Sequence, residues 1–173
     1  LTGSGEGAGT FTLNGGVPFS FSGVTEFAFN GSTLDDQSTV TPFATAALPW
    51  NVAVTIDGGA TGTDLITYNG LSGLSEKIVV QPSAPGAGQI IDNNAATGTS
   101  IAVVNYTFNT NIIVNGSSPS GTAGDTDRLT LKGTDPANPS TSGLDNFIAD
   151  FTAAGGDGTE LVKVSDENGG AAL

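Results

Sequence analysis

The chain has 173 residues, which is enough for one domain or for a stack of small repeats that share one core. Its 17 acidic and 4 basic residues give a net charge of −13, which excludes nucleic acid and anionic membrane surfaces as partners. The absence of Cys excludes disulfides, and no apolar run is long enough to insert into a membrane as a helix.

Short stretches of alternating apolar and polar residues follow one another along the whole chain. This period of two is typical of half-buried strands. The predicted strands are Thr10 to Leu13, Pro18 to Ser22, Glu26 to Asn30, Asn51 to Ile56, Leu65 to Asn69, Lys77 to Gln81, Ser100 to Phe108, Asn111 to Asn115, Arg128 to Lys132, Asn146 to Phe151 and Glu160 to Ser165.

Two of these stretches carry clusters of aromatic residues. In FSFSGVTEFAFNG the rings stand two positions apart on either side of a Gly-Val corner, so each pair shares a sheet face. We expect these four rings in the core: Phe19, Phe21, Phe27 and Phe29. In SGLDNFIADF the spacing of Leu144, Phe147, Ile148 and Phe151 also fits a helix, but the β-rich neighbours favour a strand.

The chain repeats itself. The segment from Gly7 to Gly31 returns in weakened form from Gly86 to Gly116, and GTDLITYNG from Gly62 returns as DTDRLTLKG from Asp125. We therefore expect a single domain over residues 1–173 with an internal duplication: repeat 1 at about 7–70, repeat 2 at about 86–133 and a partial third repeat at 146–165.

Asn-Gly pairs close many of the predicted strands, at Asn14, Asn30, Asn69, Asn115 and Asn168. Asn-Gly favours tight hairpins, but only Asn14 is followed promptly by another strand. Two all-β architectures therefore stay open. The first, which we favour, is a parallel β-solenoid or β-helix with Gly and Asn at its corners. The second is an antiparallel β-sandwich of jelly-roll or Ig-like type with a hairpin at Asn14.

The segments FSGVTEFAFNG, GGATGTDLITYNG and GTDPANPSTSGLDNFIADFTAAGG resemble the Gly/Thr/Asp-rich β-repeats of very large bacterial surface proteins. The resemblance covers most of the chain. It implies an extracellular or cell-surface module that is structural or adhesive, and it brings no catalytic residues.

A weaker resemblance is to the calcium-binding nonapeptide of β-roll proteins, at Gly155 to Glu160 and at Gly58 to Asp64. No cofactor is required by the sequence, but Ca²⁺ could bind to loop carboxylates. The candidate ligands are Asp64, Asp127, Asp157, Glu160, Asp35 and Asp36. The alternative is that these acids are solvated or fix turns by hydrogen bonds, as equivalent positions such as Asp64 and Asp127 allow.

The sequence predicts no enzyme, because the usual activating residues His and Cys are both absent and no pair of acids is marked by its context. Three N-glycosylation sequons begin at Asn30, Asn105 and Asn115, so glycans could decorate the chain.

The leading functional hypothesis is a structural subunit of an extracellular filament or surface layer, assembled from copies of itself head to tail. The strand formed by Thr10, Phe11, Thr12 and Leu13 is the candidate for donation to the next subunit. The alternative is a calcium-stiffened spacer or adhesin module of a giant bacterial surface protein. A third hypothesis is a carbohydrate-binding module, for which Trp50 would be exposed in its loop.

Overall fold

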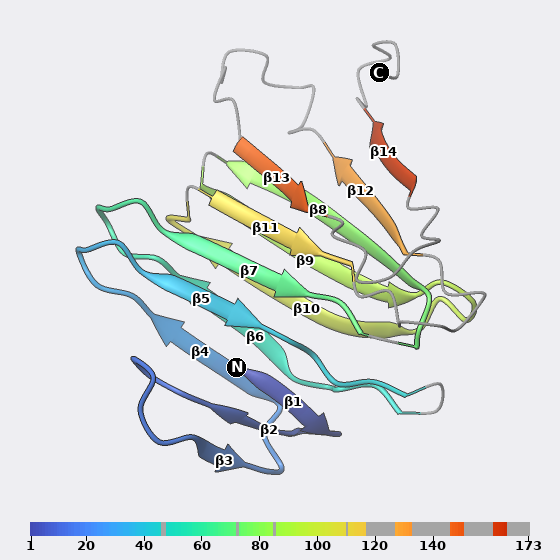
Figure 1. The fold of residues 1–173 in the computed structure, drawn as a ribbon, viewed down its shortest axis with the longest axis horizontal. Helices are drawn as coiled ribbons and strands as arrows, with labels where there is room; N and C mark the ends of the chain where they lie inside the picture. The colour runs from blue at the N-terminus through green and yellow to red at the C-terminus, as the bar shows by residue number, and fades with distance from the viewer. Residues whose placement is uncertain are drawn as a thin grey trace.

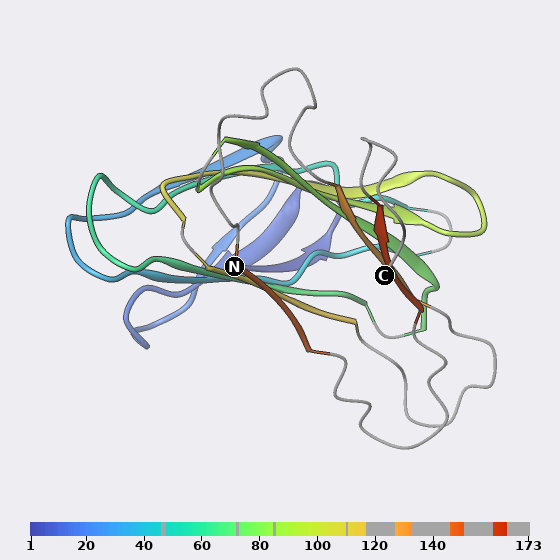
Figure 2. The same cartoon turned by 90° about the horizontal axis from the view of Figure 1, so that it is seen from above.

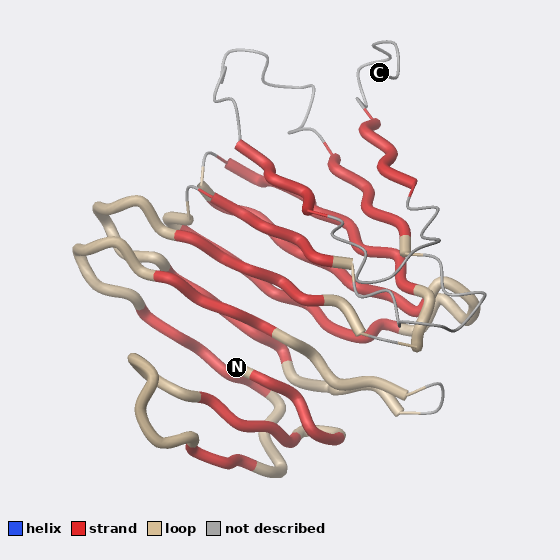
Figure 3. Tube along the Cα trace, in the orientation of Figure 1, coloured by secondary structure: helices blue, strands red, loops and turns tan. Residues whose placement is uncertain are grey.

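The computed structural model describes residues 1–45, 48–71, 73–84, 86–109, 111–116, 127–132, 146–150 and 161–165. The prediction of an all-β chain is confirmed, since strands are the regular secondary structure of these residues (Figures 1 and 3). No helix of the described residues is long and apolar enough to span a bilayer.

The strands form three sheets. The first is antiparallel with the order β1-β2-β3, the second has seven strands in the order β14-β12-β8-β9-β10-β6-β4, and the third has four strands in the order β13-β11-β7-β5. The strands are β1 (Thr2–Gly5), β2 (Ala8–Phe11), β3 (Phe19–Phe21), β4 (Glu26–Asn30), β5 (Gln37–Val40), β6 (Ala53–Asp57), β7 (Leu65–Asn69), β8 (Glu76–Ala84), β9 (Ala87–Asn94), β10 (Ser100–Thr107), β11 (Asn111–Asn115), β12 (Arg128–Lys132), β13 (Asn146–Asp150) and β14 (Leu161–Ser165).

From β4 onward the chain passes back and forth between the seven-stranded and the four-stranded sheet, which lie as two layers (Figures 1 and 2). The passage is β4 to β5, β6 to β7, β10 to β11 and β12 to β13. All pairs in the four-stranded sheet are parallel, and so are β4 with β6, β6 with β10, β8 with β12 and β12 with β14.

The core lies between these two layers. In the seven-stranded sheet Val54 pairs in register with Phe27 and Val104, and in the other sheet Ile66 pairs with Ser38 and Ile112. Because side chains alternate along a strand, every second residue of each stack points inward. The fully buried large apolar side chains are Val40, Trp50, Val54, Ile66, Tyr68, Ile78, Val80, Ile90, Val104 and Leu129.

A hairpin interrupts the alternation between the sheets. Strands β8 and β9 pair antiparallel through a turn at Gly86, whose φ of 70° suits glycine, and β9 pairs antiparallel with β10. Both hairpin strands lie in the seven-stranded sheet, whereas β7 and β11 are direct neighbours in the other. The two layers therefore differ in width. Strand β9 is met from the other layer by β7, whose Tyr68 reaches Asp92.

The three-stranded sheet covers part of one end of the stack, beside the terminal strands β4 and β5 (Figure 1). Its first residues follow the edge of β5, because Gly3 N donates to Thr41 O at 2.8 Å and Thr41 N donates to Leu1 O at 2.9 Å. The indole Nε1 of Trp50 donates to Ala8 O at 2.9 Å. These contacts attach the small sheet to the end of the core.

The predicted strands agree closely with the structure where alternation is regular. The bounds of β4, β7, β11 and β12 match the prediction, and β13 is a strand and not a helix. Strands β1, β5 and β9 were not predicted from the sequence. Strand β5, QSTV, lies in a stretch expected to be a polar loop, and only its pairing with β7 reveals it.

Two predictions about aromatic side chains are wrong. Phe19 is 56% exposed because it lies on the edge strand of the small sheet, where it stacks on Phe11 with ring centroids 5.2 Å apart. Phe21, Phe27 and Phe29 do pack against the core. Trp50, expected in an exposed loop, is fully buried because the small sheet lies over it and accepts its indole hydrogen bond.

Candidate functional site

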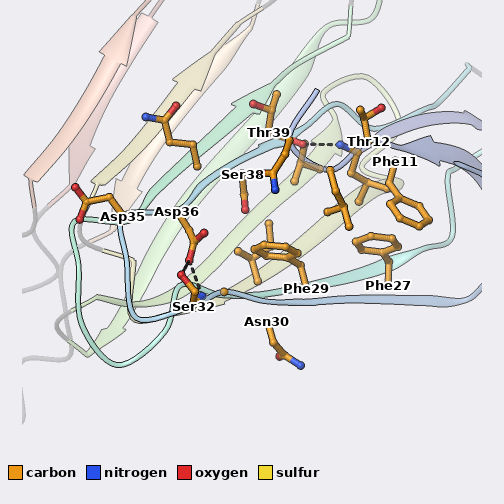
Figure 4. Close-up of a pocket in the computed structure, with 17 residues that line it drawn as sticks. Phe11, Thr12, Phe27, Phe29, Asn30, Ser32, Asp35, Asp36, Ser38 and Thr39 are labelled. Atoms are coloured by element: carbon orange, nitrogen blue, oxygen red, sulfur yellow. Dashed lines mark hydrogen bonds between the residues drawn. The ribbon is translucent and has the colours of Figure 1, made fainter. Parts of the chain in front are cut away.

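The main cavity of the described residues is a groove at the end of the stack, between the terminal strands β4 and β5 (Figure 4). Its volume is about 540 Å³, within the range of small-molecule and peptide sites. The small sheet covers the rest of this end and supplies Phe11, Thr12, Leu13 and Asn14 to the lining. The groove is therefore the part of the core that the small sheet leaves open.

The lining of the groove is mixed. Phe27 and Phe29 lie on one side and Ser38 and Thr39 on the other, with Val40 also in the lining (Figure 4). The next strands inward place Ile66 and Ile112 in register with Ser38, so a hydroxyl replaces the aliphatic side chain at the last position of this stack. The groove thus joins apolar core to polar surface.

Carboxylates at one end of the groove are held by backbone and hydroxyl donors. Asp36 Oδ2 accepts hydrogen bonds from Ser32 N at 2.6 Å and Ser32 Oγ at 3.0 Å. Asp35 Oδ1 accepts from Thr63 N, on the following turn of the chain, at 2.8 Å. Both acids therefore fix the loop between β4 and β5 in place.

Exposed apolar side chains are frequent in the N-terminal part of the described chain. Of the six large hydrophobic residues that are exposed among those described, four lie in the first 34 residues of the chain, in the connection after β2, in β3 and in the loop before β5. These four are Leu13 (53% exposed), Val17 (78%), Phe19 (56%) and Leu34 (72%). Leu13 lines the groove, and Phe19 stacks on Phe11 of its lining. Exposed apolar residues beside an open groove are typical of an interaction surface.

Two of the candidate metal ligands, Asp64 and Asp127, are buried at the starts of strands. Asp64 precedes β7 and its Oδ1 accepts a hydrogen bond from Asp36 N at 2.9 Å. Asp127 precedes β12 and its Oδ1 accepts from Glu76 N at 3.0 Å. Both carboxylates bind the backbone N–H at the start of the neighbouring strand, which explains why the sequence repeats them.

A second group of polar side chains lies inside the core. Tyr68 Oη donates to Asp92 Oδ2 at 2.7 Å, and Glu76 Oε2 accepts from Leu71 N at 2.8 Å. All three of Tyr68, Asp92 and Glu76 are fully buried. Within the described part of the chain, the buried atoms Glu76 Oε1 and Asp92 Oδ1 have no hydrogen-bond partner. Since a bare carboxylate cannot donate, a proton held between the two carboxyl groups is the way to join them.

Burial raises the pKa of both carboxyl groups of this pair, because it penalises the charged form. The pKa of Glu76 is raised to about 10, mainly by burial and then by the charge of Asp92, with a smaller effect of Asp127. The pKa of Asp92 is raised to about 6 by burial. The pKa of Tyr68 is raised by burial and by the two acids. At neutral pH the pair therefore holds one proton, on Glu76.

The sequence offered one signal for this pair that was missed. Asp92 follows Ile90 by two positions in β9, so it takes an inward position in a strand whose other inward residues are buried. Its partner Glu76 is the first residue of β8 and pairs with Asn94 of the neighbouring strand β9. The sequence could have shown that Asp92 lies on the inward face of β9, but it could not have shown the contact of Asp92 with Tyr68 of the other sheet.

The structure brings two of the candidate metal ligands together, since Asp64 Oδ1 accepts a hydrogen bond from Asp36 N. Among the described residues, no group of three or more acids is arranged to hold a metal ion. Asp35, Asp36, Asp64 and Asp127 each bind backbone donors, and Asp157 and Glu160 lie outside the described residues. Calcium binding stays a prediction that a titration must test.

The glycosylation candidates differ in their surroundings. Asn30 is exposed at the end of β4. Asn105 Oδ1 accepts a hydrogen bond from Gln89 Nε2 at 2.8 Å across the sheet. Asn115 Nδ2 donates to Asn69 Oδ1 at 2.9 Å, and Asn69 Nδ2 donates to Thr41 Oγ1 at 3.1 Å, which forms a ladder of amides along the four-stranded sheet. Asn30 is thus the most accessible of the three.

The candidate strand for donation to a neighbour is not free in this structure. Thr10 and Phe11 lie in β2, the middle strand of the small sheet, where Thr10 pairs with Thr2 on one side and Ser20 on the other. Thr12 and Leu13 follow β2 and line the groove. An assembly contact by this strand would have to break pairs that the chain already makes.

Comparison of the chain with protein families, curated proteins and solved structures gave no match.

Proposed function

We propose that the chain is a structural module of an extracellular filament or surface layer, built as a two-sheet parallel β-solenoid, and that copies stack end to end. The observation that carries the proposal is the end of the stack at β4 and β5. There an open groove lies beside two terminal strands, and two exposed apolar side chains adjoin it: Leu13 lines the groove, and Phe19 stacks on Phe11 of the lining. An open groove with exposed apolar neighbours supports an interface at this end.

The solenoid architecture is supported by the path of the chain. Successive strands alternate between two sheets and pair parallel to the strand one turn earlier, as β5 with β7 and β7 with β11. Parallel neighbours require crossover connections, and here the crossover is the passage through the opposite sheet. An antiparallel sandwich would instead pair most of its neighbours by hairpins, whereas among the described strands antiparallel pairs occur at β1 to β3 and at β8 to β10.

The directions of the terminal strands support stacking of translated copies. Strands β4 and β14 end the seven-stranded sheet and run in the same direction, since β8 and β10 are both antiparallel to β9 and the other pairs are parallel. Strands β5 and β13 likewise end a parallel sheet. A translated copy could therefore extend the seven-stranded sheet by parallel pairing at β4, which gives an open filament. The edge of β5 is already met by Leu1 to Gly3 at Thr39 and Thr41, so pairing there would first displace the N-terminal residues.

The charge of the chain must be overcome in such a filament. Two copies of net charge −13 repel each other, and this repulsion falls as salt screens it. Assembly should therefore increase with ionic strength, and a divalent cation should act at lower concentration than a monovalent salt.

The test is electron microscopy and light scattering of the purified chain over a range of concentration and salt, with calcium and with a chelator. Ser38→Lys places a charge in the groove and should abolish filaments, because an inward-pointing charge blocks strand addition. Ala28→Lys is the matched control, since Ala28 is exposed on the opposite face of neighbouring β4. Monomers under all conditions, or equal loss in both variants, would contradict end-to-end stacking.

A second function is favoured by the mixed lining of the groove. Phenylalanine rings beside hydroxyl, amide and carboxylate groups suit a carbohydrate, which presents both apolar ring faces and hydroxyls. This candidate predicts saturable binding of oligosaccharides by the monomer. Glycan-array binding that Ser38→Lys removes, without any assembly of the wild-type chain, would replace the filament proposal with this one.

A further inference from the structure

The Asn-Gly pairs differ in chemical reactivity as well as in structure. When Asn precedes Gly, the backbone nitrogen of Gly can attack the carboxamide of Asn, because Gly has no side chain to block the approach and moves freely in φ. The attack needs a Gly N–H that is not held in a hydrogen bond and a carboxamide that is free to turn. Whether each pair can react is therefore decided by the fold.

We propose that Asn14 is a site of spontaneous deamidation in the folded protein, and that the stacked strands protect Asn30 and Asn69 from the same reaction. All three are followed by Gly, so the local sequence does not distinguish them. The hydrogen bonds of the following Gly do.

The surroundings of Asn14 leave it free to react. Asn14 and Gly15 are exposed and have φ of 51° and 68°, and Gly16 N donates to Leu13 O at 2.9 Å, which defines a type I′ turn. A Cβ added to Gly15 would meet no atom within 4 Å. No hydrogen bond among the described residues uses the Gly15 N–H. The turn can therefore rearrange without breaking a contact of the core.

The surroundings of Asn30 hold the following glycine in place. Asn30 is exposed like Asn14, but Gly31 N donates to Asp57 O at 2.6 Å in the neighbouring turn of the chain. A Cβ on Gly31 would lie 2.6 Å from Gly58 O, so the backbone is closely packed there. Asn30 and Asn14 thus form a matched pair that differs mainly in whether the attacking nitrogen is free.

Asn69 is held at both reacting groups. Gly70 N donates to Asn115 O at 2.8 Å, and the carboxamide of Asn69 bonds to Asn115 and to Thr41. Asn115 is the next member of the same ladder, and its own carboxamide donates to Asn69. Asn69 should therefore be the slowest of the three to react.

The reaction balances with water as its one co-reactant. Gly15 N loses its proton to solvent base and forms a bond to Asn14 Cγ, the bond from Cγ to Nδ2 breaks, and ammonia leaves. Water then opens the resulting five-membered imide at either carbonyl. Opening at one carbonyl gives aspartate, and opening at the other gives isoaspartate, in which the main chain runs through the former side chain.

The product would change the groove. Asn14 lines it, so a new carboxylate would appear at the rim of a surface that already carries Asp35 and Asp36. This consequence rests on the proposed function: if copies stack through the groove, aged chains should assemble less well than fresh ones. The deamidation itself does not depend on that function.

The experiment is a time course of the folded chain in mildly alkaline buffer, read by peptide mapping with mass spectrometry that separates aspartate from isoaspartate. Parallel samples in strong denaturant give the rates without the fold. We expect Asn14 to convert about tenfold or more faster than Asn30 in the folded chain, which corresponds to about 1.4 kcal/mol of protection. In denaturant Asn14, Asn30 and Asn69 should convert at similar rates.

One variant separates chemistry from folding. Asn14→Gln keeps the amide but lengthens the side chain, so conversion at position 14 should stop while circular dichroism stays unchanged. Equal conversion of Asn14 and Asn30 in the folded chain would overturn the proposal, as would an intact Asn14 in the folded chain when denatured chains convert. Loss of assembly with age but without conversion at Asn14 would overturn its link to the groove alone.

Discussion

The end of the stack at the groove can be compared directly with its middle, because the strands of the two regions pair in register. In the middle, Ile66 and Tyr68 of β7 are fully buried between β5 and β11. At the groove, Ser38 takes the position of Ile66, and Phe29 is only half-buried. The same strand pattern therefore gives a closed core in one place and an open surface in the other.

This difference shows that alternation alone does not bury a side chain. An inward residue is buried where a neighbour covers it on both sides, and β4 and most of β5 have a neighbouring turn on one side only. Val40 is buried because Leu1 to Gly3 lie along residues 39–41 on the other side. The small sheet replaces the missing neighbour over Trp50 but leaves the groove open. The four predictions that follow test this contrast, from the largest expected effect to the smallest.

The largest loss of stability should come from truncating a buried side chain in the middle of the core. Ile66→Ala should lower the free energy of unfolding by about 2–5 kcal/mol, because it leaves a cavity between packed turns. Phe29→Ala should cost less than the roughly 3–5 kcal/mol usual for a buried Phe, since water already reaches its site. Urea denaturation of both variants measures the difference. A larger loss for Phe29→Ala than for Ile66→Ala would show that the groove end is packed as tightly as the middle.

The buried acid pair should make the middle of the stack sensitive to pH. The pKa of Glu76 is raised from 4.5 to about 10 and that of Asp92 from 3.8 to about 6, so the folded chain holds protons that the unfolded chain releases. The stabilisation is complete below the unfolded values and is lost as pH rises, by at most about 1.4 kcal/mol per pH unit for each group. Asp92 contributes up to about pH 6 and Glu76 up to about pH 10.

Denaturation across this pH range tests the prediction, with Glu76→Gln as the variant. The amide cannot ionise but can still donate to Asp92, so the decline above pH 6 should largely disappear. Glu26→Gln, an exposed position on β4, is the control and should keep the wild-type slope. An identical slope in Glu76→Gln and wild type would mean that the pair does not share a proton.

Substitution of Asp64, just before β7, should lower the free energy of unfolding by a smaller amount. Asp64→Ala removes the acceptor of the Asp36 N–H and should cost about 1–3 kcal/mol, whereas Asp64→Asn keeps an acceptor oxygen and should cost less. If Asp64 acts on the backbone alone, calcium should change neither value. Thermal unfolding of wild type and both variants, with calcium and with a chelator, measures this. Stabilisation of wild type by calcium that Asp64→Asn abolishes would instead assign a metal ligand.

The smallest effect should come from one charge at the rim of the groove. Asn14→Asp should change the free energy of unfolding by no more than about 0.5 kcal/mol, because the turn is exposed. It should weaken end-to-end assembly by no more than about 1 kcal/mol, and less at high salt. Light scattering against concentration gives this value. Unchanged assembly at low salt would place the contact away from this rim.

The strands of the middle turns were predicted from the sequence because their signal is local. In LITYN and NIIVN, apolar and polar residues alternate without interruption, and the observed bounds of β7 and β11 are those of the prediction. Strand β1, with the sequence TGSG, has no such alternation and becomes a strand by pairing with β2. Strand β5 likewise depends on β7.

The candidate site was less accessible to sequence reasoning. The repeated acids Asp64 and Asp127 were found, but their role as acceptors for the backbone of a neighbouring strand depends on contacts 28 and 51 residues away in the chain. The groove, its exposed apolar rim and the pair of Glu76 with Asp92 were not found. Each of them consists of residues from strands that are distant in sequence.

By itself, the sequence determined that this protein is built from short strands, that its net charge is −13, and that Asn-Gly pairs end several strands. These properties follow from composition and from patterns within a few residues. The tertiary structure alone decided which strands pair, which acids share a proton in the core and which Gly N–H is left free to react. The physical reason is that burial and hydrogen bonding depend on which neighbour each strand meets, and a repeated pattern offers each strand several similar neighbours.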